Sequence, residues 1–262
     1  MQNFLQSQTI IHQIIDALGI RSEDKVVEIG PGLGALTLPL LKLLPRLIAI
    51  EIDRDLHRYW QESPVAAQLE LVPTDALRVD YRQWGESVRL IGNLPYNIST
   101  PLILHLLNYA DCIKDMHFML QKEVAERLAA VPGNKNYGRL SIMVQYFCEV
   151  TLLFDVPPNA FTPAPKVNSS VLRLQPYSVS PYEPVNRSAL AQVVTQAFGM
   201  RRKTLANNLK PLCTPDVLRS LNIDPAARPE QISIEDYIRL AQTLFPENQP
   251  ITPSPAGGRE LG

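Results

Sequence analysis

The chain has 262 residues, of which 45% are hydrophobic and 19% charged, which is enough for one large core or for a core domain with a smaller second domain. Its formal net charge of -1 argues neither for nor against a nucleic-acid partner, so any basic surface must be local. The cysteines are isolated and the histidines scattered, which excludes a disulfide framework and a metal signature. The sequence has no apolar run long enough for a transmembrane helix and shows no signal peptide. We therefore expect a cytoplasmic protein without metal.

Strands and helices are expected to alternate through the first half of the chain. The expected strands are 25–29, 46–51, 69–73, 88–92 and 113–120, and the expected helices are 7–19, 35–44, 54–61, 101–109 and 122–130. This alternation predicts an α/β fold, with a parallel sheet that carries helices on both faces.

The pattern changes near residue 150. Two further strands, 152–156 and 170–174, enclose a proline-rich segment, and a linker over 176–184 precedes the expected helices 189–198, 203–209, 215–221 and 234–245. We therefore expect a first domain over 1–178, a small all-helical domain over 179–246, and a disordered tail over 247–262, which is rich in proline and glycine.

A glycine-rich loop follows the first of these strands. Its sequence, Glu28-Ile29-Gly30-Pro31-Gly32-Leu33-Gly34, places glycines where the backbone must approach a ligand closely. With Ala35 in the third position, the loop also meets the looser dinucleotide fingerprint, so a nicotinamide cofactor stays open at this point. The acidic start and the extra Gly34 resemble instead the first motif of S-adenosylmethionine-dependent methyltransferases.

Polar residues close the next three strands in order. Glu51 is suited to accept hydrogen bonds from a ribose diol, and Asp75 one from an adenine amine, although Asp75 also suits a helix N-cap. Asn93 follows the fourth strand. Ligands of open α/β sheets bind at the carboxyl ends of the strands, so these residues and the glycine loop predict one nucleoside site.

The residues after the fourth strand, Asn93-Leu94-Pro95-Tyr96, combine two acceptors with a flat face. The Asn93 side-chain oxygen and a backbone carbonyl of Leu94 or Pro95 accept hydrogen bonds, and the Tyr96 ring is an aromatic platform. Together they suit a planar amine on an aromatic base, such as N6 of adenine. The bland alternative is a turn with Tyr96 as a packing residue.

These motifs, together with others along the chain, closely resemble the ribosomal RNA small-subunit adenine dimethyltransferases. The matching segments are Gln2-Asn3-Phe4-Leu5, Glu28-Ile29-Gly30-Pro31-Gly32, Glu51-Ile52-Asp53, Asp75-Ala76, Gly92-Asn93-Leu94-Pro95-Tyr96-Asn97-Ile98-Ser99-Thr100-Pro101, Met119-Leu120-Gln121-Lys122-Glu123-Val124, Tyr137-Gly138-Arg139-Leu140-Ser141, Pro157-Pro158-Asn159-Ala160-Phe161-Thr162-Pro163-Ala164-Pro165-Lys166-Val167 and Phe198-Gly199-Met200-Arg201-Arg202-Lys203-Thr204-Leu205.

The resemblance implies a Rossmann-like, S-adenosylmethionine-dependent methyltransferase domain followed by a small helical RNA-binding domain. It implies dimethylation of N6 on two adjacent adenosines in a hairpin loop near the 3′ end of 16S rRNA, by a protein that acts on immature 30S subunits and that we expect to be a monomer. The expected cofactor-binding residues are Asn3, Leu5, Gly30, Gly32, Glu51, Ile52, Asp75, Ala76 and Asn93.

Asn93, Leu94, Pro95 and Tyr96 are the expected catalytic residues, and Phe161 is the candidate for a second aromatic platform against the flipped adenine. Phe161 also fits an ordinary core position. The expected RNA-binding residues are Lys166, Arg201, Arg202 and Lys203. We expect no general base, because the sulfonium methyl group is already activated.

Three other interpretations stay open on the sequence. The first is a related 23S rRNA dimethyltransferase that confers macrolide resistance, the second an RNA-binding assembly factor for small subunits, and the third a nicotinamide-dependent oxidoreductase. The family usually carries a basic arm before the Gln-Asn-Phe-Leu motif, whereas here Met1 stands where that arm ends in a glycine. We expect the fold to be kept without the arm, and part of the RNA contact to be affected.

Overall fold

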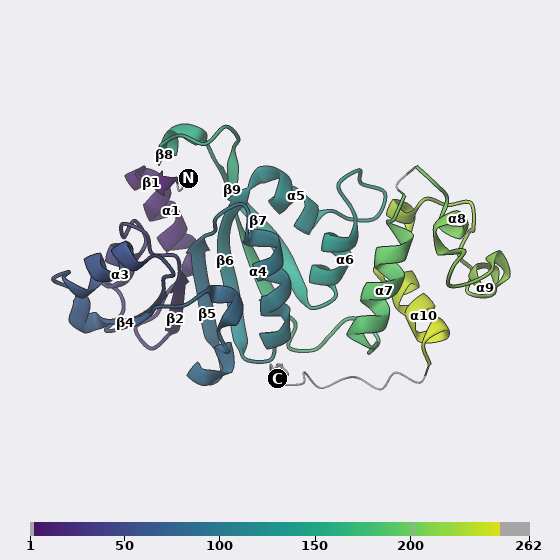
Figure 1. Ribbon diagram of the computed structural model, residues 1–262, viewed down its shortest axis with the longest axis horizontal. Helices are drawn as coiled ribbons and strands as arrows, with labels where there is room; N and C mark the ends of the chain where they lie inside the picture. Colours follow the sequence, from purple (N-terminus) through teal and green to yellow (C-terminus); the bar gives the residue numbers. More distant parts are fainter. Residues whose placement is uncertain (1–2, 201, 247–262) are drawn as a thin grey trace, which may run out of the picture. The chain divides into compact units, whose positions relative to one another are not determined.

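The computed structural model of the protein describes residues 3–200 and 202–246 (Figure 1). The predicted disordered tail, 247–262, therefore lies outside the described residues. Contacts divide the chain into two compact units. The first runs to Ala129 and resumes over Phe147–Tyr177, and the second comprises Ala130–Tyr146 and the described residues from Ser178 onward.

A seven-stranded sheet forms the centre of the first unit. Its strands are β2 (Lys25–Ile29), β3 (Leu47–Ile50), β4 (Leu69–Val72), β5 (Val88–Asn93), β6 (Ile113–Gln121), β7 (Cys148–Val156) and β9 (Ser169–Pro176), in the order β4-β3-β2-β5-β6-β9-β7. The five strands β4, β3, β2, β5 and β6 pair in parallel, as predicted. Strand β9 pairs antiparallel with both β6 and β7. The sheet is therefore mixed, and the antiparallel strands add the start of β9 to the same edge as the end of β6.

Helices precede, connect and follow the parallel strands. They are α1 (Gln8–Leu18), α2 (Thr37–Leu40), α3 (Arg54–Gln61), α4 (Ser99–Leu106) and α5 (Lys122–Ala129), with short 3-10 segments at Ala66–Gln68, Ala76–Arg78, Tyr81–Trp84, Leu107–Tyr109 and Pro158–Ala160. The predicted helix 35–44 is shortened to α2. Turns follow from Leu41, and the helix does not continue to Pro45, whose ring is not compatible with a helix interior.

Apolar residues are buried on both faces of the parallel strands. All four residues of β3 and the first five of β5 are buried. On one face, Ala49 and Ile91 belong to a core cluster with Ile11, Ile14 and Leu18 of α1. Burial on both faces explains why these strands are apolar runs rather than alternating patterns.

A two-stranded antiparallel sheet joins the N-terminal segment to the proline-rich segment. Strand β1 (Phe4–Leu5) pairs with β8 (Phe161–Thr162), with Leu5 opposite Phe161. These strands are too short for a periodic pattern, and the sequence did not predict them.

A buried ion network lies at the beginning of β5. The Arg89 guanidinium donates to Asp24 at 2.7 Å, to both carboxylate oxygens of Asp115 at 2.9 Å, and to the Leu18 carbonyl at the end of α1 at 2.6 Å. Burial raises the pKa of Asp24, but hydrogen bonds from the Arg21 backbone and the side chains of Lys114 and Arg89 outweigh it and lower this pKa to about 2. Arg89 thus compensates two buried carboxylates and caps a helix.

The second unit is helical. It contains α6 (Arg139–Gln145), α7 (Arg187–Ala197), α8 (Leu205–Leu209), α9 (Pro215–Ser220) and α10 (Ile234–Leu244), with a 3-10 segment at Pro229–Gln231. The sequence pattern did not predict α6, and the predicted boundary places it in the first domain. In the structure, the neighbouring Tyr137 ring meets Phe198 edge-on, and Phe198 contacts Tyr237, so residues 130–146 complete the core of this unit.

Candidate active site

The glycine loop leaves β2 in a conformation that is fixed at both ends. Gly30 has a φ of 71° and donates its N–H to the Ile50 carbonyl of β3 at 2.9 Å. The Trp60 indole of α3 donates to the Gly32 carbonyl at 3.0 Å. A Cβ atom at Gly34, which has a φ of 94°, would lie 2.7 Å from the Trp60 ring. A side chain at Gly34 would therefore displace the loop from α3.

Glu51 and Asp75 stand at the ends of β3 and β4, as predicted. One Glu51 oxygen accepts the Asp53 N–H at 2.9 Å, and burial raises the pKa of the carboxyl although backbone hydrogen bonds oppose this. One Asp75 oxygen accepts the Leu77 N–H at 3.0 Å, so the capping role considered for Asp75 is present. Its second oxygen has no partner among the described residues and is available to a ligand.

Glu28 is a buried acid behind the glycine loop, and the sequence prediction did not include it among the site residues. Its carboxylate accepts the Thr37 hydroxyl at 2.7 Å and is 1% exposed. Burial raises the pKa of Glu28 to about 7, opposed by the bond from Thr37 and assisted by the charge of Glu51.

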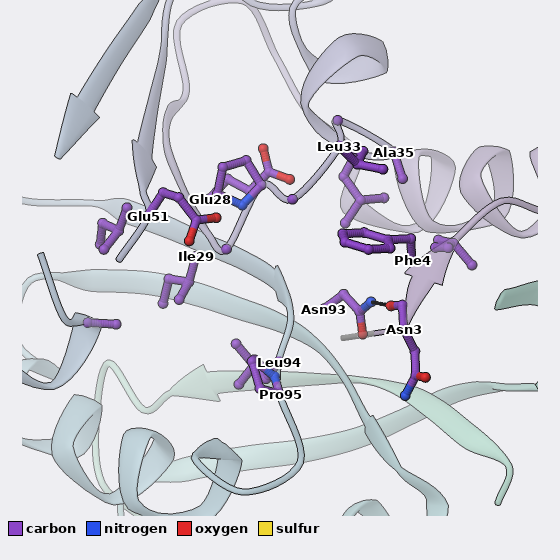
Figure 2. A pocket seen from close by; sticks show the side chains of 18 of the residues that line it. Asn3, Phe4, Glu28, Ile29, Leu33, Ala35, Glu51, Asn93, Leu94 and Pro95 are labelled. Carbon is purple, nitrogen blue, oxygen red and sulfur yellow. Dashed lines mark hydrogen bonds between the residues drawn. The ribbon is translucent and has the colours of Figure 1, made fainter. Parts of the chain in front are cut away.

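Asn93, the last residue of β5, has a defined amide orientation. Its Nδ2 donates to the main-chain carbonyl of Asn3 at 3.2 Å (Figure 2). Its Oδ1 has no partner among the described residues. Asn93 therefore offers an acceptor, as the sequence predicted, and the N-terminal segment fixes which atom is offered.

A cavity of about 1010 Å³ connects these features. Its lining includes all the predicted cofactor-binding residues and four predicted catalytic residues, namely Asn3, Leu5, Gly30, Gly32, Glu51, Ile52, Asp75, Ala76, Asn93, Leu94, Pro95 and Tyr96. Residues that the prediction left out also line it, among them Phe4, Glu28, Leu33 and Thr74. Phe4 lies beside the loop at Leu33 (Figure 2), and its ring would be 3.4 Å from a Cβ atom at Gly32.

Phe161 is not among the residues that line the cavity. It is 4% exposed and belongs to the same core cluster as Leu5 and Ile11. Its strand pairing with β1 holds it there. The structure therefore places Phe161 in the core position considered as its alternative, outside the lining of the cavity that includes Tyr96.

The predicted RNA-binding residues fall into two groups. Lys166 is exposed in the loop between β8 and β9 of the first unit, and Arg202 and Lys203 are exposed before α8 in the second unit. Arg201 lies outside the described residues. Lys122, another lysine of the first unit, forms an ion pair with Asp155.

The charges around the cavity suit a cationic cofactor. Glu28, Glu51 and Asp75 contribute carboxyl groups, and Lys42 is the one lysine or arginine of the described lining. A pyrophosphate would require the opposite charge and a helix N-terminus aimed at it. The helix after the loop, α2, has four residues and no side-chain cap. Within the described part of the chain, the site therefore fits a sulfonium nucleoside better than a dinucleotide.

The family model described as "Ribosomal RNA adenine dimethylase" matches residues 1–245. The chain belongs to this family. Among curated relatives, the "Ribosomal RNA small subunit methyltransferase A" of Legionella pneumophila (strain Corby) is 57% identical over 93% of this chain and 95% of its own length. The protein of the same name from Idiomarina loihiensis is 52% identical over 93% and 85%, respectively.

Solved structures agree with this assignment. A dimethyladenosine transferase from Plasmodium falciparum has a TM-score of 0.74 and 30% identity, over 90% of this chain and 95% of its own. The 23S rRNA methyltransferase ErmE, at 24% identity, has a TM-score of 0.71 over 92% and 99%, and supports the fold. This member of the family is thus a methyltransferase with a Rossmann-like sheet and a helical C-terminal part. It uses S-adenosyl-L-methionine to dimethylate N6 of adenine in ribosomal RNA.

The stability of this protein is expected to depend on pH through Glu28. In the folded state the pKa of Glu28 is raised to about 7 from an ordinary 4.5. The contribution of this carboxyl to the free energy of unfolding is therefore fully present below pH 4.5 and is lost as the pH rises through 7. Glu28→Gln keeps an acceptor for Thr37 but carries no charge. The variant should therefore gain about 3 kcal/mol relative to wild type between pH 5 and pH 8.

Urea unfolding of both proteins without cofactor, at several pH values across this window, measures the difference. A difference that stays constant from pH 5 to pH 8 would contradict the assignment to Glu28.

No described helix is both long enough and apolar enough to cross a membrane. Likewise, no group of three or more His, Cys, Asp or Glu residues within 3–200 and 202–246 is placed to hold a metal ion.

Proposed function

We propose that this protein dimethylates N6 of two adjacent adenosines in a 3′-terminal hairpin loop of 16S rRNA, within immature 30S subunits in the cytoplasm. The names of the relatives at 57% and 52% identity support the small subunit as the source of the RNA. The 23S alternative is represented by a structure at 24% identity, which bears on the fold alone. The function therefore rests on the family, and the choice of atom rests on the site.

The observation that supports the residue roles is the orientation of the Asn93 amide. With Nδ2 bound to the Asn3 carbonyl, Oδ1 is left to accept a hydrogen from an adenine amine. The Pro95 carbonyl accepts from the backbone of Ile98 and Ser99, so the Leu94 carbonyl is the better second acceptor. Two acceptors on the N6 hydrogens draw the nitrogen toward a tetrahedral shape.

S-adenosylmethionine supplies a methyl group that is already activated on a sulfonium. The cavity residues would hold it at the strand ends, with Glu51 and Asp75 as acceptors for its ribose and adenine groups. Bound there, it would supply the methyl group to the N6 lone pair with the sulfur as leaving group, and one N6 proton would pass to water. Asn93 and Leu94 contribute alignment and stabilise the positive charge that develops on N6. No base is required.

Tyr96 is proposed as the platform on which the extruded adenine stacks. Tyr96 lines the cavity two residues beyond Leu94 and is half-buried. Aromatic stacking recognises a base that has left its own stack. Lys166, Arg202 and Lys203, which are exposed, are proposed to contact RNA phosphates.

Methyl transfer from labelled cofactor to 30S particles that lack these methyl groups tests the proposal. We expect label on two adjacent adenosines of the 3′ hairpin loop, two methyl groups on each, mapped by primer extension and mass spectrometry. Undermethylated 50S particles, presented at the same concentration, are the control for the 23S alternative. Label on 23S rRNA, or on a single adenosine elsewhere in 16S rRNA, would refute the proposed substrate.

A further inference from the structure

The ring of Tyr96 is tied to a strand that is distant in sequence. Its hydroxyl lies 3.0 Å from the hydroxyl of Ser169, the first residue of β9. Ser169 is 1% exposed, and its Cα pairs with Gln121 of β6 on one side and with Val156 of β7 on the other. The Ser169 hydroxyl is therefore carried by a strand that is paired on both sides, between β6 and the edge strand β7.

The backbone of Tyr96 is tied by a second serine. Ser99, the first residue of α4, donates its hydroxyl to the Tyr96 carbonyl at 3.2 Å and is also 1% exposed. Buried serines thus bind Tyr96 at both ends, the carbonyl and the phenol. Tyr96, held between them, still lines the cavity. An exposed tyrosine in a loop would rotate about two torsions, whereas this one has one favoured orientation.

We infer that Ser169 is a positioning residue that fixes the Tyr96 ring in the orientation in which the target adenine stacks. This rests on the proposed role of Tyr96 as the platform. Without the hydrogen bond to Ser169, the Tyr96 ring becomes ordered only when the base binds. The entropy lost in ordering the ring then weakens RNA binding and the alignment of the base. A single neutral hydrogen bond of this kind changes kcat/KM by about 3- to 10-fold.

The test is a double-mutant cycle on the full chain with undermethylated 30S particles. Tyr96→Phe keeps the ring and removes the phenol oxygen, and Ser169→Ala removes its partner. We expect each to lower kcat/KM for 30S particles by about 3- to 10-fold, and the double variant to be no worse than the weaker single variant. The KM for S-adenosylmethionine should stay unchanged, which a general loss of structure would not allow.

Ser170→Ala is the matched control. Ser170 follows in the same strand, is 3% exposed, and gives its hydroxyl to Asp155 rather than to Tyr96. The inference would be overturned if Tyr96→Phe and Ser169→Ala had the same kcat/KM for 30S particles as this control. It would also be overturned if the losses of the two substitutions multiplied in the double variant. If Ser169→Ala no longer binds the cofactor in calorimetry, Tyr96→Phe alone decides, because it leaves Ser169 in place.

Tyr96→Ala separates this inference from the proposed function. If removal of the whole ring leaves methylation at the wild-type rate, the platform itself is refuted. If Tyr96→Ala loses much more than 10-fold while Tyr96→Phe and Ser169→Ala behave like Ser170→Ala, the platform stands and only the positioning role of Ser169 is refuted.

Discussion

We expect Asn93→Ala to lower the rate of methyl transfer by about 10²- to 10³-fold, the range found when one preorganised group at a transition state is removed. In the proposed mechanism, the alanine removes the Oδ1 acceptor that aligns the amine and stabilises its developing positive charge. The carboxyl end of β5 keeps its backbone hydrogen bonds, such as that from the Leu94 N–H to the Met119 carbonyl at 3.2 Å. Single-turnover methylation of 30S particles measures the rate, with unfolding temperature and cofactor affinity measured in parallel.

Asn93→Asp separates alignment from proton abstraction. A carboxylate has the same shape, but it cannot donate to the Asn3 carbonyl and would place an oxygen against it. If Asn93 aligns the amine, the Asp variant should be nearly as slow as the Ala variant. If position 93 served as a base, Asp would keep or raise the rate. Gln61→Ala, an exposed amide at the end of α3, is the control; near-wild-type activity of Asn93→Ala would refute the mechanism.

Arg89→Met should destabilise the fold by about 3–5 kcal/mol, because it removes the guanidinium that pairs with the largely buried Asp115 carboxylate and leaves Asp24 with only Lys114 and the Arg21 N–H. The side chains of Asp24 and Asp115 are 7% and 11% exposed, and the Leu18 carbonyl of α1 loses its donor as well. Arg89 lies at the opposite end of β5 from Asn93, so the folded variant should keep its affinity for S-adenosylmethionine. Urea unfolding at pH 7 measures the loss.

Arg46→Met provides the comparison. Arg46 also forms an ion pair with an acid, Glu70, but its side chain is 68% exposed. Exposed pairs contribute about 1 kcal/mol or less, so this variant should unfold close to wild type. Equal losses from the two substitutions would show that burial of the Arg89 network does not set its contribution.

Much of the site was predictable because parallel strands bring their carboxyl ends to one edge. Gly30, Glu51, Asp75 and Asn93 are far apart in sequence, yet each follows an apolar run that is recognisable as a strand, and the cavity contains all four. Strand limits agreed within a few residues for the same reason, since runs buried on both faces leave a strong signal.

The remaining features depend on contacts that no local pattern encodes. Helix α6 has seven residues and its period is too short to recognise, and its place is set by packing against α7. The carbonyl that orients Asn93 belongs to Asn3, ninety positions away. Ser169 reaches Tyr96 because β9 runs antiparallel, so that the start of the strand lies at the site. Phe161 was expected at a platform because prolines flank it, but strand pairing turns it into the core.

The orientation of the Asn93 amide also bears on product release. In the proposed mechanism, its free Oδ1 accepts a hydrogen of the substrate amine, and each methylation removes one such hydrogen. Adenine offers two, monomethyladenine one and dimethyladenine none. The finished base therefore leaves a desolvated acceptor unpaired, which costs about 1–3 kcal/mol. In the proposed site, the same oxygen that favours binding of adenine and monomethyladenine disfavours binding of dimethyladenine. Release of the product after the second transfer therefore needs no separate structural change.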